Sequence, residues 1–283
     1  MNSNPEWRKD ALLDKPYFAP LHPFVYRLGR DAFPTLQDCN ALLEWHTPAV
    51  TVQSGQPVRF VAQQHGKLPF ESQYEPRCYL KGEVATREGN WHDLFNALVW
   101  MAFPKAKAAI NARHYHVLTD HSKGADTGMS GGRGSTRDTS TLLDESGVIV
   151  VCADAELARL LRDFQWKELF WVRREQVRSS MGFYLFGHGL YEKALRTYIG
   201  MTGQGLLLAA EPEFFNWALE RQLEYLDGRL SAYLSDRQHL TSTRELTPVP
   251  LLGIPGWAAE NECAVYYDNK DYFRAGRHGR SAS

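Results

Sequence analysis

This sequence lacks most of the features that place a chain in a known class of protein. Its 283 residues include only four cysteines, and these form no CxxC pair or other spacing typical of a metal site. No apolar run reaches the roughly 18 residues that a membrane-spanning helix needs. The N-terminal residues also lack the apolar core and cleavage site of a secretory signal. We therefore expect no membrane span, no disulfide framework and a location in the reducing cytoplasm.

The chain also lacks a large net charge. The 32 Lys and Arg residues are balanced by 33 Asp and Glu residues, so the formal net charge is -1. Proteins that bind nucleic acid through its phosphates usually carry an excess of positive charge, and we expect no nucleic-acid partner. The chain is 43% hydrophobic and 23% charged, as globular proteins commonly are. Its length allows one large domain or two small ones and leaves the oligomeric state open.

The distribution of prolines, glycines and apolar residues predicts an α+β fold, a single mainly helical domain with a few short antiparallel strands and a hairpin. Five prolines within residues 1–34 predict an extended segment that lies over the core. The globular domain is expected at residues 35–273, with its first strands before residue 90. Five glycines predict a mobile loop at residues 120–141, which matches no phosphate-binding pattern. The small and basic residues 274–283 predict a disordered tail.

The predicted hairpin lies at residues 142–151, LLDESGVIVV, where two apolar runs flank a polar turn. Gly147 can take the positive φ that a bulged turn requires. Asp144 and Glu145 then have two interpretations. They either form the turn, as acidic residues usually do, or act as paired carboxylates in metal binding or acid/base chemistry.

The longest helical run, residues 90–116, also carries the densest mixture of histidine, amide, carboxylate and lysine side chains. Asn90 predicts the N-cap of a first helix, and the run from Leu94 to Phe103 is apolar on most of its circumference. Pro104 cannot continue that helix, and it predicts the first residue of a second helix. We expect a helical pair whose first member is buried on most sides.

The polar side chains of this pair fall on two narrow arcs. In the first helix the arc also contains Trp100 and Phe103, which a solvent-facing stripe rarely carries. In the second helix the polar residues are spaced i, i+4 and i+7. Each arc is therefore either the wet face of an amphipathic helix or the wall of an aromatic-lined pocket with convergent polar groups. On the second interpretation the candidate catalytic residues are His92, Asp93, Asn96, Lys107, Asn111 and His114.

A second group of candidates lies in residues 187–193, GHGLYEK. His188 and Glu192 are four residues apart, a spacing that lets both side chains bind one metal ion from one helix face. The same spacing also produces an ordinary contact within a helix. If a divalent metal is the cofactor, the candidate ligands are His92, His188, Glu192 and Asp144.

Three stretches occur along the chain in a characteristic order: NWHDLFNALVWMAFPKAKAAINARH, RDTSTLLDESGVIVV and LFGHGLYEKAL, with PVPLLGIPGW after them. Together they resemble a proteobacterial family known as domain of unknown function three thousand and twenty-five. The resemblance extends from about Tyr74 to Phe273. It implies a soluble bacterial protein with one domain, and it supplies no activity that could be assigned to particular residues.

We expect a hydrolase-type enzyme that is metal-assisted or uses general acid/base catalysis. Clustered ionisable groups on apolar helices favour this interpretation, because burial shifts their pKa values. The hypothesis requires that His92, His114 and His188 come together in the fold. The side chains that would orient a small-molecule ligand or stabilise negative charge are Asn96, Lys107 and Asn111.

The alternative is a non-catalytic module that binds a small anion or a protein partner. Positive side chains would supply its charge, and exposed aromatic side chains would anchor the partner. The positive residues are Lys107, Arg113, Arg137 and Arg173. Bound metal and turnover would favour the enzyme, whereas a folded protein with neither would favour the binding module.

Overall fold

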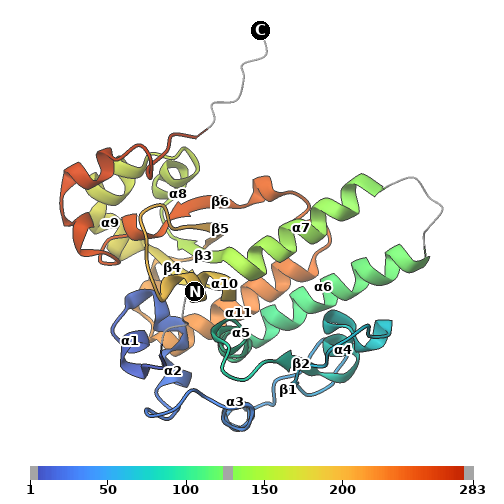
Figure 1. Cartoon of the computed structure of the whole chain (residues 1–283). Helices are drawn as coiled ribbons and strands as arrows, with labels where there is room; N and C mark the ends of the chain where they lie inside the picture. Colours follow the sequence, from blue (N-terminus) through green and yellow to red (C-terminus); the bar gives the residue numbers. More distant parts are fainter. Residues whose placement is uncertain (1–5, 124–129, 277–283) are drawn as a thin grey trace.

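The computed structural model describes residues 6–123 and 130–276, and within them the side chains of all residues except 121–123 and 130–137. It is an α+β fold in which most of the structure is helical, as the sequence predicts (Figure 1). The centre of the predicted loop, residues 124–129, and residues 277–283 of the predicted tail lie outside this description.

A four-stranded mixed sheet forms the larger of two sheets. Its strands are β3 (Gly147–Cys152), β4 (Met181–Leu185), β5 (Thr202–Ala209) and β6 (Thr247–Pro250), in the order β4-β3-β5-β6. β3 pairs in parallel with β5 and antiparallel with β4, and β5 pairs antiparallel with β6. All six residues of β3 are buried, which suits the run of β-branched side chains in this central strand. The prediction of antiparallel strands is therefore wrong for the pair β3 and β5.

The hairpin predicted at residues 142–151 is wrong. Helix α7 (Ser130–Ser146) runs directly into β3, so Asp144 and Glu145 lie in the last turn of a helix and not between two strands. Gly147 does not have the positive φ that was predicted. Glycine is needed at this junction because a Cβ there would lie 2.3 Å from the Leu143 carbonyl oxygen. Adjacent leucines fit a helix as well as a strand, so the apolar pattern could not distinguish the two.

A second sheet contains two parallel strands, β1 (Arg59–Ala62) and β2 (Glu83–Thr86). Helix α4 (Tyr74–Lys81) lies in the connection between them. Gly82 ends α4 in the left-handed region, with a φ of 69°, where glycine is favoured. The short connection back to β2 keeps α4 against α6, so that its first turn faces the site described below.

Five helices position that site. They are α5 (Trp91–Ala102), α6 (Pro104–Lys123), α7, α10 (His188–Ala194) and α11 (Leu219–Ser235). The Asn90 side chain caps α5 by accepting from the Asp93 backbone N–H at 3.1 Å, and Pro104 begins α6, as predicted. α6 and α7 lie side by side, and both extend into residues 120–141 (Figure 1). The loop prediction is therefore wrong for the residues described there.

Within the predicted N-terminal segment, residues 9–25 are mostly helical and not extended. They form α1 (Lys9–Leu13), a 3₁₀ helix at Pro16–Leu21 and α2 (His22–Val25). Prolines stand in the first turns of the last two elements, where the missing N–H would have had no partner in any case. The prediction of an extended segment is therefore wrong for residues 9–25, because prolines at helix starts are compatible with helical structure.

The remaining helical elements are short. They are α3 (Leu36–Leu43), α8 (Ala155–Arg162), α9 (Arg174–Ser180) and single turns at Phe70–Ser72, Glu168–Val172, Pro212–Asn216, Thr243–Glu245, Leu251–Gly253, Ala259–Glu262 and Ala264–Asp268. No helix in the described part of the chain combines the length and the apolar character that a bilayer crossing requires.

The N-terminus of α6 is capped by a side chain from another helix. Asp227 of α11 accepts hydrogen bonds from the backbone N–H groups of Lys105 at 3.1 Å and Ala106 at 2.8 Å. These are two of the donors that a helix start leaves without an internal partner. Burial raises the pKa of Asp227 to about 6, against the effect of these hydrogen bonds.

Replacement of Asp227 with asparagine is expected to change how stability depends on pH. The folded-state pKa of about 6 exceeds the ordinary value of 3.8, so the folded protein holds a proton in this window that the unfolded chain loses. The free energy of unfolding of the wild type therefore falls as the pH rises from about 4 to about 6, and the variant should show a smaller fall. Urea denaturation across this range measures the difference. Glu220→Gln, an exposed change on the same helix, should follow the wild type, and equal slopes for Asp227→Asn would contradict the prediction.

Candidate metal centre

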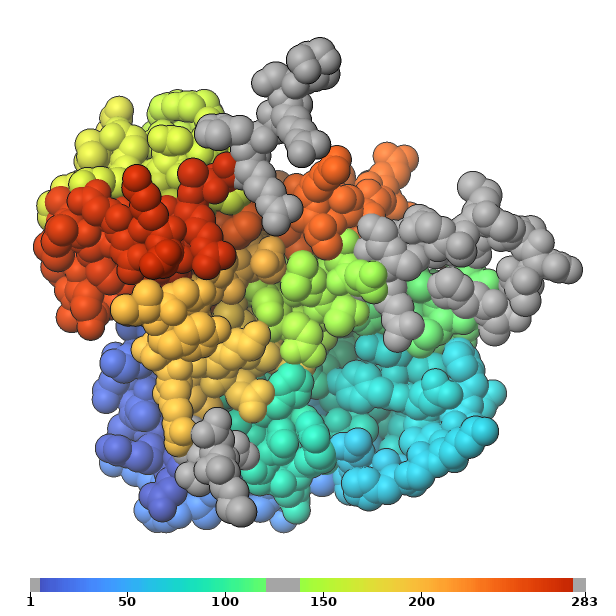
Figure 2. All heavy atoms as spheres, turned by 45° about the horizontal axis from the view of Figure 1, so that its top comes forward, coloured from blue at the N-terminus to red at the C-terminus, as the bar shows by residue number. Residues whose placement is uncertain are grey.

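A cavity of about 440 Å³ opens where α4, α5, α6, α7 and α10 meet. Figure 2 shows the surface hollowed where the cyan segment around α4 meets α7 and the start of α5. Trp100 and Phe103 do not line it, because they are 1% and 0% exposed and belong to the core. The cavity wall is therefore more polar than the aromatic pocket predicted. Its ionisable side chains include Glu75, Arg77, Arg87, His92, Asp93, His114, Asp144, Glu145 and His188.

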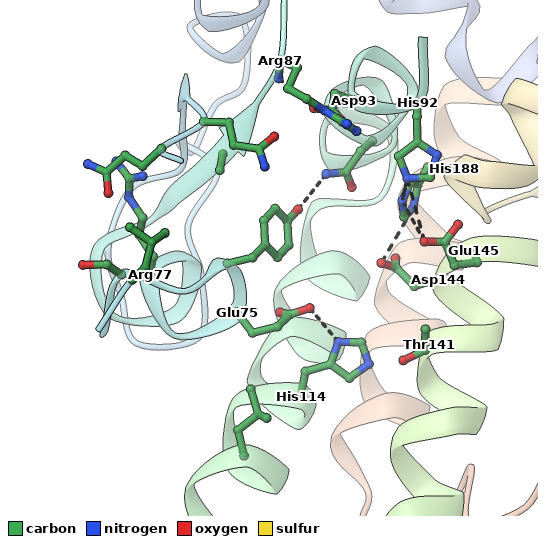
Figure 3. A pocket seen from close by; sticks show the side chains of 18 residues that line it. Glu75, Arg77, Arg87, His92, Asp93, His114, Thr141, Asp144, Glu145 and His188 are labelled. Atoms are coloured by element: carbon green, nitrogen blue, oxygen red, sulfur yellow. Dashed lines mark hydrogen bonds and ion pairs between the residues drawn. The ribbon is translucent and has the colours of Figure 1, made fainter. Parts of the chain in front are cut away.

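Two imidazoles and one carboxylate converge at the cavity wall (Figure 3). The Nε2 atoms of His92 and His188 are 3.0 Å apart. Glu145 Oε1 lies 3.5 Å from His188 Nε2 and 3.8 Å from His92 Nε2. A point equidistant from three atoms with these separations lies about 2.0 Å from each, which is the length of zinc–nitrogen and zinc–oxygen bonds. The three side chains form a candidate metal centre.

A second carboxylate lies behind each imidazole, at hydrogen-bond distance from His92 but not from His188, whose Nδ1 is buried without a hydrogen bond within the described residues. Glu192 Oε2 lies 3.0 Å from His92 Nδ1, and Asp144 Oδ2 lies 3.7 Å from His188 Nδ1. Carboxylates in this position orient metal-binding histidines and leave the other ring nitrogen free for the ion. Both rings accordingly present Nε2 on the side of Glu145.

The protonation states suit metal binding. Burial lowers the pKa of His188 to about 3, against the effect of Asp144, so the ring is neutral at physiological pH. Burial alone would raise the pKa of Asp144, but Lys107 and His188 lower it to about 2. Lys107 Nζ donates to Asp144 Oδ1 at 2.5 Å. Behind the neutral imidazole of His188 there is thus an ionised carboxylate with its own cation.

Within the described residues, three carboxylates around the cavity form ion pairs with histidines and with no Lys or Arg. They are Glu75, Glu145 and Glu192. Other acidic side chains on or behind the wall have Lys or Arg partners. These pairs are Asp93–Arg87, Glu83–Arg77 and Asp144–Lys107. At the metal centre, the ion pairs of Glu145 and Glu192 within the described residues are with histidines alone. A bound divalent cation would balance these two negative charges.

Comparison with known proteins places the chain in a family. The family model described as "Protein of unknown function (DUF3025)" matches residues 58–277, which include all three candidate ligands. The chain belongs to the DUF3025 family. No curated protein matches the chain, and no solved structure matches it either. The evidence on function therefore comes from the geometry of the site.

Two glycines beside His188 allow this DUF3025 chain to bring α10 against the end of α7. A Cβ at Gly187 would lie 2.4 Å from the Gly147 backbone nitrogen, and one at Gly189 would lie 2.4 Å from Glu145 Oε2. Real Cβ atoms do not approach other atoms so closely. The sequence Gly-His-Gly is thus the local reason that His188 and Glu145 meet.

This chain brings together all four residues predicted as metal ligands, but only two of them present atoms to the common point. His92 and His188 present Nε2 to a common point. Asp144 and Glu192 contact the Nδ1 atoms instead, so we assign them as supports of the two histidines. The carboxylate oxygen at that point belongs to Glu145. Neighbouring residues on a helix point about 100° apart, so Asp144 and Glu145 face different atoms of the centre.

The predicted catalytic residues all lie on or directly behind the cavity wall. His92, Asp93, Asn96 and His114 line the cavity, whereas Lys107 contacts Asp144 from behind. The role of Asp93 in the DUF3025 chain is structural. It accepts from the Arg87 backbone N–H at 2.7 Å and from the Arg87 guanidinium at 2.9 Å. Burial would raise the pKa of Asp93, but Arg87 lowers it below its ordinary value.

Helix α4 supplies cavity residues that the sequence does not single out. Asn96 Nδ2 donates to Tyr74 Oη at 2.7 Å. Glu75 accepts from Asn111 Nδ2 at 2.6 Å, and Glu75 Oε1 lies 3.0 Å from His114 Nδ1. A single acidic residue in a segment without a motif carries no signal. Only the β1–α4–β2 connection places it beside α6.

The cations proposed for the alternative, a binding module, have other partners. Arg113 donates to the backbone carbonyl groups of Leu234 and Asp236 and so holds the end of α11. Arg173 pairs with Glu168. The side chain of Arg137 lies outside the described part of the structure. Lys107 pairs with Asp144, as noted above.

Proposed function

We propose that this DUF3025 protein is a metal-dependent hydrolase in which His92, His188 and Glu145 bind a single divalent cation. The observation that carries the proposal is the convergence of two Nε2 atoms and one carboxylate oxygen at separations that fit a zinc ion. Two histidines and one carboxylate form the ligand set of zinc in several hydrolases. Structural zinc sites usually have four protein ligands, so three ligands on a cavity wall favour a catalytic site.

His92, His188 and Glu145 would hold the ion at the cavity wall. A zinc ion there would supply Lewis-acid chemistry and would activate water near neutral pH. Glu192 and the Asp144–Lys107 pair keep the two imidazoles in place for the ion. The arrangement supports hydrolysis at a carbonyl or phosphoryl centre of a small-molecule substrate held in the cavity.

Metal content is the first test. Protein freed of any affinity tag and dialysed is expected to retain about one equivalent of zinc by mass spectrometry. His92→Ala, His188→Ala and Glu145→Ala should each lose it. His116→Ala is the matched control, because His116 also lies on a site helix but packs against Tyr79. A wild type that binds no metal even after incubation with zinc would overturn the proposal.

Turnover separates the hydrolase from the alternative. The zinc-loaded protein is expected to hydrolyse p-nitrophenyl acetate or p-nitrophenyl phosphate, and Glu145→Ala should lose this activity. A stoichiometric zinc protein that hydrolyses neither compound would favour a non-catalytic binding module. Iron in place of zinc would redirect the search, because the same ligand set binds Fe(II) in oxygenases.

A further inference from the structure

His114 lies on the wall of the same cavity and has one ring nitrogen without a partner. Its side chain is 8% exposed, and its Nδ1 lies 3.0 Å from Glu75 Oε1. Within the described residues, Nε2 is buried and makes no hydrogen bond. Figure 3 shows this nitrogen on the side of the ring away from Glu75, toward Thr141. A buried polar atom without a partner is costly, so it needs an explanation.

The surroundings of His114 determine what this nitrogen can offer. Burial alone would lower the pKa of His114, but the Glu75 carboxylate outweighs burial and raises it above 6.5. Asp144, from α7, acts in the same direction, and Lys107, on α6 itself, acts against it. Glu75 is in turn fixed by the amide of Asn111. Glu75 thus favours the protonated ring, in which Nε2–H is a donor, and this nitrogen has no acceptor within the described residues.

We propose that His114 binds an oxygen atom of the substrate through Nε2–H and donates its proton to the leaving group. The ligand class is a molecule with a carbonyl or phosphoryl oxygen near a leaving oxygen or nitrogen. The binding role stands on the cavity geometry, whereas the proton-transfer role rests on the proposed hydrolase function. His114 contacts none of the three candidate metal ligands among the interactions described, so the two parts of the cavity can be tested separately.

The reaction balances as an ordinary hydrolysis. A water molecule gives one proton to solvent, and its oxygen forms a bond to the electrophilic carbon or phosphorus. The bond to the leaving atom breaks, and the electron pair of that bond takes the Nε2 proton of His114. His114 then regains a proton from solvent. The products are an acid and an alcohol or amine, and no oxidant or other reactant is consumed.

The test uses inorganic phosphate as the probe, with the full-length protein in its zinc-loaded and metal-free forms. Calorimetry gives the affinity, and ¹⁵N NMR of the imidazoles reports on Nε2 of His114. His114→Gln keeps a donor for Glu75 but removes the second N–H. It is expected to weaken phosphate binding roughly tenfold to a hundredfold, the contribution of a charged hydrogen bond. His116→Gln, on the same helix, should bind phosphate as the wild type does.

Glu75→Gln provides a second measurement if His114→Gln is poorly folded. This change removes the carboxylate that raises the pKa of His114, so phosphate binding should weaken near neutral pH and recover as the pH is lowered. A wild type that does not bind phosphate, or a His114→Gln variant that binds within twofold of it, would overturn the proposal. If only the metal proposal fails, the ¹⁵N NMR signals of His114 should still change on addition of phosphate. Failure of the metal proposal can therefore be distinguished from failure of the His114 proposal.

Discussion

Replacing Lys107 with methionine is expected to lower the free energy of unfolding by about 3–5 kcal/mol, the usual cost of removing one partner of a buried ion pair. Lys107 is 3% exposed, and its ammonium group donates to Asp144. Methionine matches the volume of lysine but leaves the Asp144 carboxylate buried without its cation. The loss should therefore reflect an uncompensated charge and not a cavity. Urea denaturation of the metal-free proteins at neutral pH measures it.

A double variant separates the charge from the packing. Lys107→Met combined with Asp144→Leu removes both charges, and it should recover most of the lost stability, because buried ion pairs can often be replaced by apolar residues of similar volume. Lys105→Met is the matched control two residues earlier. Lys105 is exposed, so this change should cost little. A Lys107→Met variant that is destabilised no more than the Lys105→Met variant would contradict the prediction.

Gly189→Ala is expected to weaken zinc binding at least tenfold while leaving the fold nearly intact, since displaced metal-site geometry commonly costs tenfold to a hundredfold in affinity. The added Cβ would lie 2.4 Å from Glu145 Oε2, which is the free end of a flexible side chain. The carboxylate can move away, and the Glu145 backbone carbonyl oxygen, 3.1 Å from the added Cβ, must give by only a few tenths of an ångström. The movement of the carboxylate takes Glu145 out of the triangle with His92 and His188. Zinc titration with a competing chelator gives the affinity, and thermal unfolding of the metal-free protein gives the stability.

Two other glycines provide the contrast. At Gly187 the added Cβ would meet the backbone nitrogen of Gly147, which cannot move without shifting β3, so Gly187→Ala should unfold the protein more readily. At Gly228, in α11, nothing lies within 4 Å of the added Cβ, and alanine should be neutral or slightly stabilising. If Gly189→Ala binds zinc as tightly as Gly228→Ala does, Glu145 is not a ligand.

The helical pair at residues 90–116 could be predicted because its signals are local. Asn90 caps the first helix, Pro104 begins the second, and the apolar circumference of α5 requires burial whatever lies around it. These features depend on residues within a few positions of one another. These local signals predict that His92 and His114 lie on neighbouring helices of one site.

The sequence offered Asp144 and Glu145 together as carboxylates for metal binding, but it could not predict which of the two faces the Nε2 atoms, because this depends on whether residues 142–146 are a helix or a strand. In the predicted hairpin Asp144 and Glu145 would both have belonged to an exposed turn. At the end of α7 they point in different directions, one to Nδ1 and one to Nε2 of His188. Glu75 was missed for a different reason. Its contact with His114 joins two helices whose relative position is set by the parallel pairing of β1 with β2.

The candidate ligands are separated by about 50 residues between His92 and Glu145 and by about 40 between Glu145 and His188. An ion held by all three would therefore act as a crosslink that closes two long loops of the chain. Because the unfolded chain does not hold the three side chains together, the ion would bind the native state alone, so stability would rise with free metal concentration. At a thousandfold excess over the dissociation constant the gain is about 4 kcal/mol. Metal supply would then govern how long the folded protein persists as well as whether it can react.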